Sequence, residues 1–421
     1  MIKQQYLNRI VDAELGAHLE AFGAVLIEGP KWCGKTRTAM EHAASAIYLQ
    51  DINKRKDYHK IADAAPSALL EGKTPRLIDE WQTIPVLWDG VRFEVDRRKE
   101  AGQFILTGSA VPMDKAVLHT GTGRISRLIM RPMTLFESLE SNGSVSLGSL
   151  FNGEDIKGTS SLTIEKLAFA LVRGGWPASV GVKESIALRR AREYVRAVIN
   201  TDISRVDGVE KNPERVRKLM RSLARNTSTM AKLTTIKSDI AAADETISDN
   251  TIASYMNALR RIFVIEDVLA WSPDMRSKTA LRTSSKRHFV DPSIAAALLH
   301  ISPKSLLTDF NTFGLLFESL CMRDLRVYAQ ALDGEVFHYH DKNDLEADAI
   351  VELYDGRWGA VEVKMGADEI EEAAKNLMKL KEKIDADSMG DPSFLMVITA
   401  GEYAYRRKDG VYVVPIGCLR N

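Results

Sequence analysis

One stretch constrains the fold more than any other part of this chain: Gly29-Pro-Lys-Trp-Cys-Gly-Lys35-Thr36. It has the GxxxxGK[ST] spacing of a phosphate-binding loop (P-loop, or Walker A motif). An apolar run at 24–27 precedes it and a helical pattern follows it, which is the strand–loop–helix order that such a loop requires. Glycines let backbone N–H groups turn toward phosphate oxygens, and the helix start adds partial positive charge. The stretch therefore predicts an α/β domain with a parallel sheet that binds a nucleotide.

The polar residues of this loop have distinct expected roles. Lys35 can reach the β- and γ-phosphates and so contributes to catalysis, and the Thr36 hydroxyl is placed to ligate Mg²⁺. The residues that we expect to contact the nucleotide are Gly29, Pro30, Lys31, Trp32, Cys33, Gly34, Lys35, Thr36 and Arg37.

Further along, Arg76-Leu-Ile-Asp-Glu-Trp81 is predicted as a short apolar strand that ends in the two carboxylates Asp79 and Glu80. In a nucleotide site, Asp79 would hold Mg²⁺ through water, and Glu80 would polarise the attacking water. Two adjacent acids after an apolar run also occur in solvated turns. The pairing with the upstream P-loop favours the magnesium and general-base roles.

A third buried strand, 103–109, is expected between the loop strand and the Asp79 strand, as in additional-strand ATPases. Its tip would present Thr107 or Ser109 near the γ-phosphate. The alternative is that these hydroxyls satisfy a local turn.

Arg124 precedes the strand-like stretch 125–131. Its guanidinium could reach the phosphates of its own or of a neighbouring subunit as an arginine finger, which makes it a candidate catalytic residue in a homo-oligomer. The alternative is a solvent-facing arginine on a strand.

Length and composition limit the remaining classes. The chain has 421 residues, enough for two or three domains, and its formal net charge is zero, so any nucleic-acid binding must come from a local patch. The three cysteines lie far apart and form no metal-binding spacing, and Cys33 lies inside the P-loop, which favours a reducing compartment. No run approaches a membrane span, and Met1-Ile-Lys-Gln-Gln-Tyr6 has no signal-peptide core, so we expect a cytoplasmic protein.

These motifs together resemble a known family. The P-loop, Leu77-Ile-Asp-Glu-Trp-Gln82, Leu106-Thr-Gly-Ser109 and the arginines from 124 to 131 look like prokaryotic AAA-type ATPases fused to a C-terminal domain of unknown function. The resemblance continues through Arg173-Gly-Gly-Trp-Pro177 and Lys286-Arg-His-Phe-Val-Asp291, so it covers nearly the whole chain. It implies ATP and Mg²⁺ as cofactors and ATP hydrolysis as the activity.

The middle of the chain divides into three expected parts. Residues 141–161 are rich in Ser, Gly and Asn and are interpreted as a linker, and residues 162–212 as a helical segment. Residues 213–295 predict three helices and a basic hairpin, the pattern of a winged helix–turn–helix.

Lys and Arg outnumber Asp and Glu in this winged-helix segment, so it is locally basic. If it binds double-stranded DNA, its third helix would face the groove and the hairpin loop would contact phosphates. The alternative is a packing module with solvated arginines. The groove-facing candidates are Thr251, Ser254, Asn257, Arg260 and Arg261, and the phosphate candidates are Arg276, Lys278 and Arg282.

In the last part, residues 296–421, a hairpin through Asp355-Gly356 would bring Asp348 beside Glu362 and Lys364. This pattern resembles a restriction-endonuclease-like (PD-D/E-x-K) core, which implies Glu318 on the preceding helix as a further metal ligand candidate. Two carboxylates and a lysine can bind Mg²⁺ and orient water on a phosphodiester, so Asp348, Glu362 and Lys364 are candidate nuclease residues. The usual proline before the aspartate is replaced by Ala347, and a Glu-x-Lys pair is also common on wet strand faces. His338 and His340 share a strand face without a third ligand, which favours satisfied or solvent-facing histidines.

The sequence therefore predicts an N-terminal AAA-type P-loop ATPase (1–140), the linker, the helical segment, the winged helix and a nuclease-like α/β domain. We expect ATP binding and hydrolysis to control the C-terminal region, which acts on or near DNA. The alternative is an ATP-dependent signalling or partner-binding switch with an inert nuclease-like scaffold.

Overall fold

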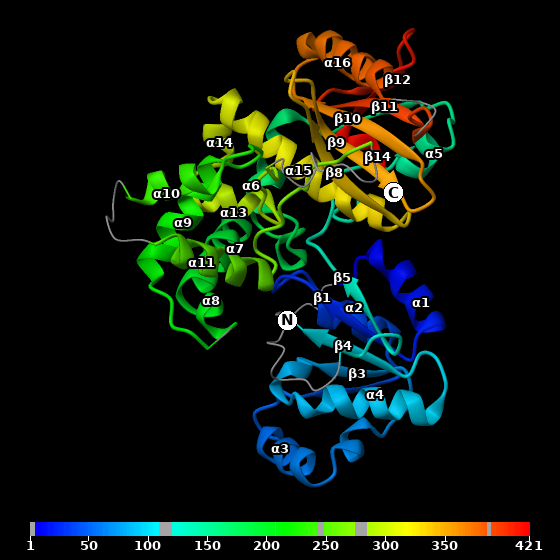
Figure 1. Ribbon diagram of the computed structural model, residues 1–421, viewed down its shortest axis with the longest axis vertical. Helices are drawn as coiled ribbons and strands as arrows, with labels where there is room; N and C mark the ends of the chain where they lie inside the picture. Colours follow the sequence, from blue (N-terminus) through cyan, green and yellow to red (C-terminus); the bar gives the residue numbers. More distant parts are fainter. Residues whose placement is uncertain (1–4, 109–119, 207, 242–247, 274–283, 385–388) are drawn as a thin grey trace. The chain divides into compact units, whose positions relative to one another are not determined.

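The computed structural model describes residues 5–108, 120–206, 208–241, 248–273, 284–384 and 389–421 (Figure 1). The chain forms two compact units. The first comprises Met1–Pro132, Thr201–Glu210 and Asn257–Val264, and the second comprises Met133–Asn200, Lys211–Met256 and Ile265–Asn421.

The first unit is built on a parallel five-stranded sheet with the order β2-β3-β4-β1-β5. Its strands are β1 (Ala24–Glu28), β2 (Ser45–Tyr48), β3 (Arg76–Asp79), β4 (Phe104–Gly108) and β5 (Ile125–Ile129). Every residue of β1 and β4 is buried, as expected of central strands in a sheet covered on both faces. The predicted strands are confirmed, and β4 lies between the P-loop strand β1 and the Asp79 strand β3.

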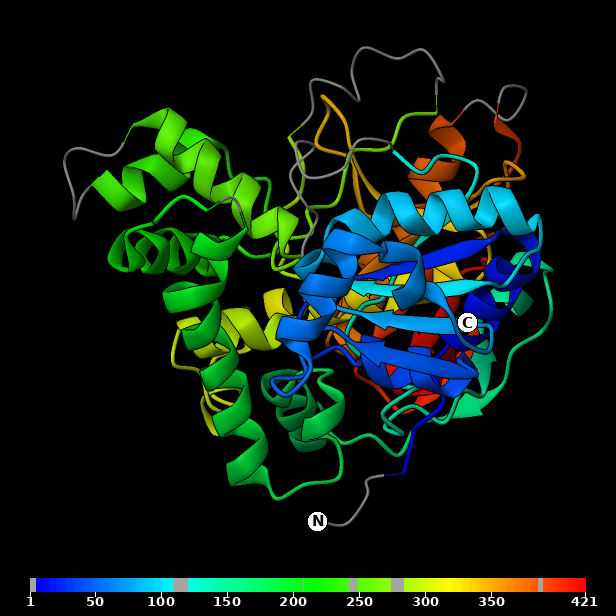
Figure 2. The ribbon, with the colours of Figure 1, turned by 90° about the horizontal axis from the view of Figure 1, so that it is seen from below.

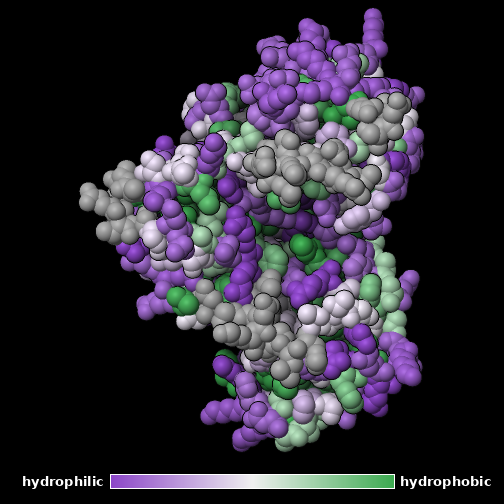
Figure 3. All heavy atoms as spheres, viewed as in Figure 1, coloured by the Kyte–Doolittle hydropathy of each residue, from purple (hydrophilic) through white to green (hydrophobic). Residues whose placement is uncertain are grey.

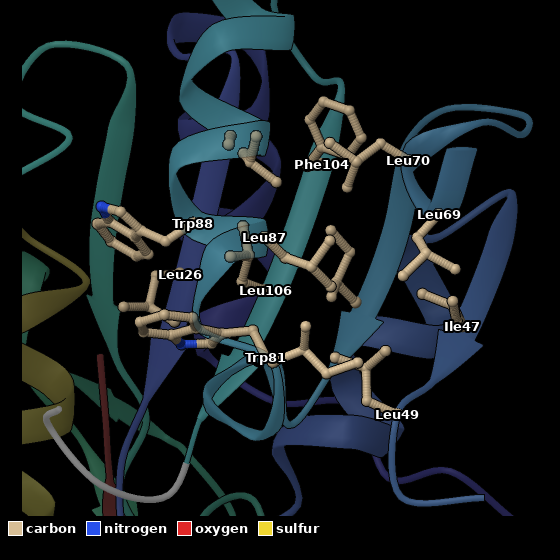
Figure 4. Close-up of a cluster of buried hydrophobic side chains, with 14 of the residues drawn as sticks. Leu26, Ile47, Leu49, Leu69, Leu70, Trp81, Leu87, Trp88, Phe104 and Leu106 are labelled. Atoms are coloured by element: carbon tan, nitrogen blue, oxygen red, sulfur yellow. The ribbon is translucent and has the colours of Figure 1, made fainter. Parts of the chain in front are cut away.

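Helices cover both faces of this sheet because successive side chains of each strand point in opposite directions. The helical elements are α1 (Val11–Ala21), α2 (Lys35–His42), α3 (Arg55–Ala64), η1 (Pro66–Leu70), η2 (Trp81–Thr83) and α4 (Val86–Arg98). Leu26, Phe104 and Leu106 pack with α4, as Figure 4 shows. Val25 and Ile105, from the opposite face, pack with α1 and α2. The run of α4 along the sheet is visible in Figure 2.

Helix α1 is shorter than the helical pattern of residues 2–20 suggests. It begins at Val11, and the described residues before it are not helical. Tyr6 and Arg9 instead form side-chain hydrogen bonds with residues of α1, α2 and the P-loop. These long-range polar contacts compete with a helical conformation, and sequence periodicity does not detect them.

The second unit contains a helical region followed by a sheet domain. The helical elements are α6 (Ile164–Arg173), η4 (Pro177–Ser179), α7 (Glu184–Ala197), the π-helical turn η5 (Val198–Asp202), α8 (Ile203–Arg205), α9 (Pro213–Arg225), α10 (Leu233–Ala241), α11 (Asp249–Arg261), α13 (Pro292–Leu298) and α14 (Pro303–Leu306); η5, α8 and α11 include residues of the first unit. Asn212 caps α9 and Pro213 is its first residue, and the Ser248 hydroxyl accepts a hydrogen bond from the Thr251 N–H at the start of α11. The three helices of the predicted winged-helix segment are therefore present.

The C-terminal sheet has the order β7-β12-β13-β11-β10-β9-β8 in the described part of the chain. Its elements are β7 (Gly158–Thr159), β8 (Gly334–His340), β9 (Glu346–Leu353), β10 (Trp358–Lys364), β11 (Phe394–Thr399), β12 (Tyr403–Arg406) and β13 (Tyr412–Pro415), with α15 (Phe310–Gln330), η6 (Ala367–Glu369), α16 (Ile370–Lys383) and η7 (Ile416–Cys418). Strands β8, β9 and β10 are antiparallel neighbours, and β11 joins β10 in parallel after α16.

Helix α16 covers one face of this sheet with an apolar stripe. Ala373, Leu377 and Leu380 are buried against Trp358, Ala360 and other strand residues. Charged residues such as Glu371, Lys375 and Glu382 occupy its outer face, and Figure 3 shows the surface over α16 as mostly hydrophilic. The helix is therefore amphipathic and positions β10 from one side.

The interpretation of residues 141–161 as a linker is wrong. This segment forms β6 (Val145–Ser146), α5 (Leu147–Phe151) and β7; β6 pairs with β14 (Leu419–Arg420) and β7 pairs with β12. The hydroxyls of Ser141 and Ser146 donate to the carbonyls of Leu419 and Asn421, at 2.7 and 2.8 Å. The polar residues that suggest a linker are the side chains that attach this segment to the C-terminal domain.

The helices of the described residues are all too short or too polar to cross a membrane.

Candidate functional site

The P-loop connects β1 to α2 and has the backbone that its glycines predict. Gly29 and Gly34 have φ angles of 149° and 107°, in the region that side chains disfavour. A Cβ atom at Gly29 would lie 2.1 Å from the Met130 carbonyl oxygen, so no other residue fits there. Gly34 provides no side-chain cap for α2, which leaves the first-turn amides to another acceptor. The loop is thus shaped to receive an anion.

Lys35 lies inside this loop. Its side chain is buried, and Nζ donates to the carbonyl oxygens of Gly29 and Pro30, each at 2.8 Å. These are neutral acceptors, and they hold the ammonium against the loop backbone without neutralising it. The positive charge of Lys35 is therefore kept for a ligand of opposite sign.

Asp79 is the point at which three elements of the first unit meet. The Thr36 hydroxyl, at the start of α2, donates to Asp79 Oδ1 at 2.7 Å, and the Thr107 hydroxyl from β4 donates to the same oxygen at 2.8 Å. The parallel order of β3, β4 and β1 brings these residues to one edge of the sheet. The structure thus brings together Thr36, Asp79 and Thr107, and this hydroxyl–carboxylate set suits Mg²⁺, which prefers oxygen ligands.

Glu80 follows directly and has a constrained conformation. Its φ angle is 55°, its N–H donates to Thr107 Oγ1 at 3.2 Å, and its Oε2 accepts a hydrogen bond from Gln82. Glu80 is only partly buried, so its carboxylate remains open to water. Gln82 is a contact of the site that sequence reasoning did not assign, although it belongs to the same short motif.

The other predicted loop residues surround this centre. Trp32 has a φ angle of 69° and its side chain is 48% exposed, while Cys33 is fully buried. Lys31 Nζ lies 2.6 Å from Asp202 Oδ1, and Arg37 pairs with Glu41 at 2.6 Å on the outside of α2. Lys31 and Arg37 are therefore at the rim of the loop, already engaged with carboxylates.

Arg9 supports the loop from behind and was not foreseen from the sequence. Its Nη1 donates to the Cys33 carbonyl and its Nη2 to the Arg131 carbonyl, both at 2.8 Å. Arg9 is buried, so it joins the P-loop to the end of β5 without contact with bulk solvent. Since its partners lie far along the chain, local patterns carried no signal for it.

Arg124 does not reach the phosphate end of its own domain, so that part of the prediction is wrong. Its carbonyl accepts from the N–H of Ala24, the first residue of β1, whereas the P-loop follows the last residue. The length of β1 puts it about 16 Å from that loop. Its guanidinium pairs with Asp96 at 2.9 Å and is half exposed. A role in a neighbouring subunit is not tested by this geometry.

The DNA-facing candidates are only partly described. Ser254, Asn257 and Arg260 are exposed along one side of α11, with Thr251 and Arg261 partly buried. Ser109, Arg276, Lys278 and Arg282 lie outside the described residues. Two antiparallel bridges, Ile265 with Phe289 and Val268 with Lys286, follow α11 where the hairpin was predicted.

The second candidate site lies in the C-terminal domain, at a pocket of about 670 Å³. The β9–β10 register pairs Val361 with Ala349, which brings Asp348 beside Glu362 as expected. Lys364 Nζ lies 3.1 Å from Glu362 Oε2, and Asp348 Oδ2 accepts the N–H of Val363 at 2.9 Å. The predicted hairpin constellation is therefore assembled.

Lys286 changes the chemistry of this constellation, and the expected metal site is not formed. Its Nζ lies 2.7 Å from Glu318 Oε1 and 2.8 Å from Asp348 Oδ1. Among the described residues, no group of three His, Cys, Asp or Glu side chains could hold a metal ion. The set Glu318, Asp348 and Glu362 is thus wrong as a ligand set, because the Lys286 ammonium lies between two of its members.

Burial and these neighbours shift the acid–base behaviour of the pocket. Burial and the Asp348 charge raise the pKa of Glu318 and of Glu362 to about 8. Burial would also raise the pKa of Asp348, but Lys286 and Lys364 hold it below its ordinary value. The carboxyl groups of Asp348 and Glu318 keep the pKa of Lys286 above its ordinary value despite burial. Asp348 is therefore the principal anionic partner of Lys286.

The two histidines on β8 do not form a metal site. His338 is buried, and its ring Nε2 lies 3.1 Å from the Ser284 carbonyl oxygen. Burial and the nearby Lys286 charge lower its pKa to about 4, so the ring is neutral at pH 7. His340 lies 3.6 Å from the exposed Asp344. The interpretation of satisfied or solvent-facing side chains agrees with these contacts.

The Gly174-Gly175-Trp176 turn, whose purpose the sequence left open, belongs to a buried polar network. The Gly175 N–H donates to Asp291 Oδ2 at 2.9 Å, and Arg323 Nη1 donates to the same oxygen at 3.0 Å. A Cβ atom at Gly175 would lie 2.1 Å from the Met133 carbonyl oxygen. The turn therefore has a packing role, and its glycines allow close backbone approach.

Comparison with known families divides the chain into three parts. Residues 21–139 match the model of a family described as an AAA domain. Residues 164–305 match a domain of unknown function, DUF8612, and residues 313–419 match another, DUF4143. Among curated proteins, none matches the chain.

Several solved structures are similar at low identity. The Walker-type ATPase PABY2304 of Pyrococcus abyssi is 15% identical, covers 70% of this chain and 97% of its own, and gives a TM-score of 0.45. A Drosophila ORC structure bound to DNA is 11% identical, with coverage of 66% and 89% and a TM-score of 0.21. The Hef helicase domain of Pyrococcus furiosus is 12% identical, with coverage of 98% and 94% and a TM-score of 0.21.

The family matches agree with the geometry of the first unit. The chain has an AAA-type, P-loop ATPase domain at its N-terminal end and a DUF4143 domain at its C-terminal end.

Proposed function

We propose that this protein binds ATP with Mg²⁺ and hydrolyses it, and that its nucleotide state controls the winged-helix and nuclease-like regions. The observation that carries the proposal is the meeting of the Thr36 and Thr107 hydroxyls on one oxygen of Asp79, beside the uncapped start of α2. Phosphates and a hard divalent cation need this combination of amides, hydroxyls and carboxylate.

Each residue of the site has a defined role in the proposal. The loop amides and the Lys35 ammonium bind and orient the phosphates, Thr36 and Asp79 hold the cation, and Glu80 accepts a proton from the attacking water. Thr107 fixes both acids, since it donates to Asp79 and accepts from the Glu80 N–H. When bound, Mg²⁺ would neutralise charge on the β- and γ-phosphates.

Two substitutions separate binding from turnover. Lys35→Ala should abolish binding of a fluorescent ATP analogue, because the loop loses its unneutralised charge. Glu80→Gln should retain binding and lower phosphate release by about 10²-fold or more, since an amide cannot accept the proton.

The exposed residues Lys54 and Glu71 supply matched controls, Lys54→Ala and Glu71→Gln, which should behave as wild type. Unchanged turnover in both Lys35→Ala and Glu80→Gln would refute these roles.

The topology of the C-terminal domain supports a nuclease-like fold. We propose that this domain has a restriction-endonuclease-like core. Its elements follow the order α15, antiparallel β8, β9 and β10, then α16 and the parallel strand β11. Acidic residues and a lysine lie at the hairpin of β9 and β10. This support concerns the fold alone.

We propose that the segment 213–295 contacts double-stranded DNA. Three helices followed by antiparallel bridges support a winged helix, and Ser254, Asn257 and Arg260 on the exposed side of α11 have the polar chemistry of groove-facing residues. The test is the ATPase rate of the full chain with and without single- and double-stranded DNA. Stimulation by duplex that Arg260→Ala weakens supports the proposal, and indifference to both forms of DNA rejects it.

A second candidate function follows from Lys286. Because its ammonium lies between Glu318 and Asp348 in the C-terminal pocket, that domain could serve as an inert scaffold in an ATP-dependent partner-binding switch. An ATPase that ignores DNA, in a protein that does not shift duplex at low salt, favours this function over action on DNA.

A neighbouring subunit could supply an arginine to the nucleotide. Arg124 is half exposed and lies at the opposite end of the sheet from its own P-loop, so we propose that any finger role is exercised in a homo-oligomer. Mixing Arg124→Ala with Lys35→Ala protein should restore ATPase activity if subunits share sites. The absence of restoration in a proven oligomer rejects this role.

A further inference from the structure

The C-terminal acidic pocket contains a cation of the chain itself, the Lys286 ammonium. Glu318 on α15 and Asp348 on β9 each place one carboxylate oxygen within 2.8 Å of the same point, which is Lys286 Nζ. The second oxygen of Asp348 accepts the Val363 N–H. Both oxygens of Asp348 are therefore occupied by donors of the chain itself.

Lys286 is fixed in this position by its backbone as well as by its charge. Its N–H donates to the Val268 carbonyl and its carbonyl accepts the Val268 N–H, both at 2.9 Å. The residue is only 8% exposed. Moving this side chain into solvent would break its contacts with Glu318 and Asp348 and would leave the buried Asp348 carboxylate unpaired, which is costly.

We propose that the Lys286 ammonium takes the position that a divalent cation would need between Glu318 and Asp348, so that the pocket binds no metal and cleaves no phosphodiester. Mg²⁺ and Mn²⁺ bind carboxylate oxygens at about 2.0–2.2 Å and would have to share this point with a positive group. Like charges in a buried site repel strongly. The inference rests on the proposed nuclease-like fold but not on the proposed ATPase activity.

The same geometry predicts what the pocket would bind once the lysine is removed. Methionine has nearly the length of lysine and no charge, so Lys286→Met keeps the packing and frees two carboxylates that already converge. Glu362, whose Oε1 is buried without a hydrogen-bond partner among the described residues, lies beside them. The altered pocket should therefore accept a hard divalent cation with waters completing its coordination.

The experiment is a titration of the full chain with Mn²⁺, without nucleotide, in which free Mn²⁺ is followed by its electron paramagnetic resonance signal. Wild type and Asp348→Asn should bind equally, because the wild-type pocket contributes no site. Lys286→Met should bind about one additional Mn²⁺ per chain, and Lys286→Met/Asp348→Asn should lose it. Plasmid cleavage in Mn²⁺ should be absent in wild type.

Two results would overturn the proposal. One is a wild-type Mn²⁺ site, or a wild-type cleavage activity, that Asp348→Asn removes; this comparison does not depend on the folding of Lys286→Met. The other is a folded Lys286→Met protein that gains no site. The ATPase rate is measured on the same proteins. If the proposed ATPase function fails, wild type shows no more turnover than Lys35→Ala, and the Mn²⁺ result still tests the Lys286 proposal.

Discussion

Two strand carboxylates of this protein, Asp79 and Asp348, were both predicted as magnesium ligands, and they differ in what surrounds them. Asp79 is the last residue of β3 and is followed by Glu80, whereas Asp348 is the third residue of β9 and lies beside Glu362 on β10. Asp79 is half-buried and accepts hydrogen bonds from two neutral hydroxyls. Asp348 is buried and paired with an ammonium that is also buried. Neutral donors leave the charge of Asp79 available to a cation, whereas Lys286 cancels that of Asp348. The partner of a buried or half-buried carboxylate, rather than the acid itself, therefore decides whether the carboxylate can bind a cation or only supports the fold.

Removal of Asp348 should give the largest effect on stability. Asp348→Ala leaves Lys286 buried with the weaker partner Glu318, and we expect the free energy of unfolding to fall by about 3–5 kcal/mol. Urea denaturation of the full chain measures it. The control is Asp344→Asn, because Asp344 is 95% exposed at its side chain, asparagine tolerates its φ angle of 57°, and the change should cost about 0.5 kcal/mol or less. Equal small effects at both positions would show that the Lys286 pair is not a structural support.

A smaller effect is expected from Thr107→Val, which keeps the shape of the side chain and deletes its hydroxyl. Asp79 loses one of two donors, and the Glu80 N–H loses its acceptor. We expect a loss of about 1–3 kcal/mol in unfolding free energy and a clear drop in ATP turnover. The exposed Thr122, changed to Val, serves as the control. Normal turnover in Thr107→Val would remove this residue from the site.

The pH dependence of stability tests the buried acid Glu362 of the C-terminal pocket. Burial and the Asp348 charge raise the pKa of Glu362 to about 8, so the folded state holds a proton that the unfolded state releases near pH 4.5. This contribution is present at low pH and is lost as pH rises toward 8, with a slope of at most about 1.4 kcal/mol per pH unit. Urea denaturation at several pH values gives the free energies of unfolding of wild type and of Glu362→Gln. The difference between the two isolates the Glu362 contribution from that of the histidines. A difference that does not change with pH contradicts the prediction.

The smallest effect concerns the ion pair between Lys31 and Asp202 at the rim of the P-loop. Lys31 is 41% exposed at its side chain, so a double-mutant cycle with Lys31→Ala and Asp202→Ala should give a coupling of about 0.2–1 kcal/mol. Added salt should weaken it, because solvent screens the pair. The buried Lys286–Asp348 pair should keep its coupling in salt, and a similar salt response of both pairs would contradict the difference in burial as its cause.

The nucleotide-binding fold could be predicted from sequence because its signals are local. The P-loop, the Asp79-Glu80 pair and Thr107 each follow an apolar run, and parallel strands bring their ends together. The same rule could have corrected the role predicted for Arg124. This residue precedes its strand, so it lies at the amino ends of the parallel strands, away from the P-loop. The information was present in the order of strand and arginine.

Other residues could not be found this way. Arg9 supports Cys33 and Arg131, and Lys286 meets Glu318 and Asp348, in each case across long sequence separations. Hydrophobic periodicity reports only the spacing of apolar residues along one segment, so it cannot predict a polar contact between distant segments. The polar segment 141–161 failed for a related reason, since serines that hydrogen-bond to distant carbonyls have the composition of a linker.

The pairing of β6 with β14 sets an order of events during synthesis. Leu419 and Arg420 emerge from the ribosome about 270 residues after Val145 and Ser146, a delay of roughly 15 to 55 s at ordinary translation rates. Throughout that interval the growing polypeptide holds a strand whose neighbour has not yet been made. The AAA-type domain can be complete while the later domain still lacks its closing contact, which makes this seam one of the last parts of the newborn protein to settle.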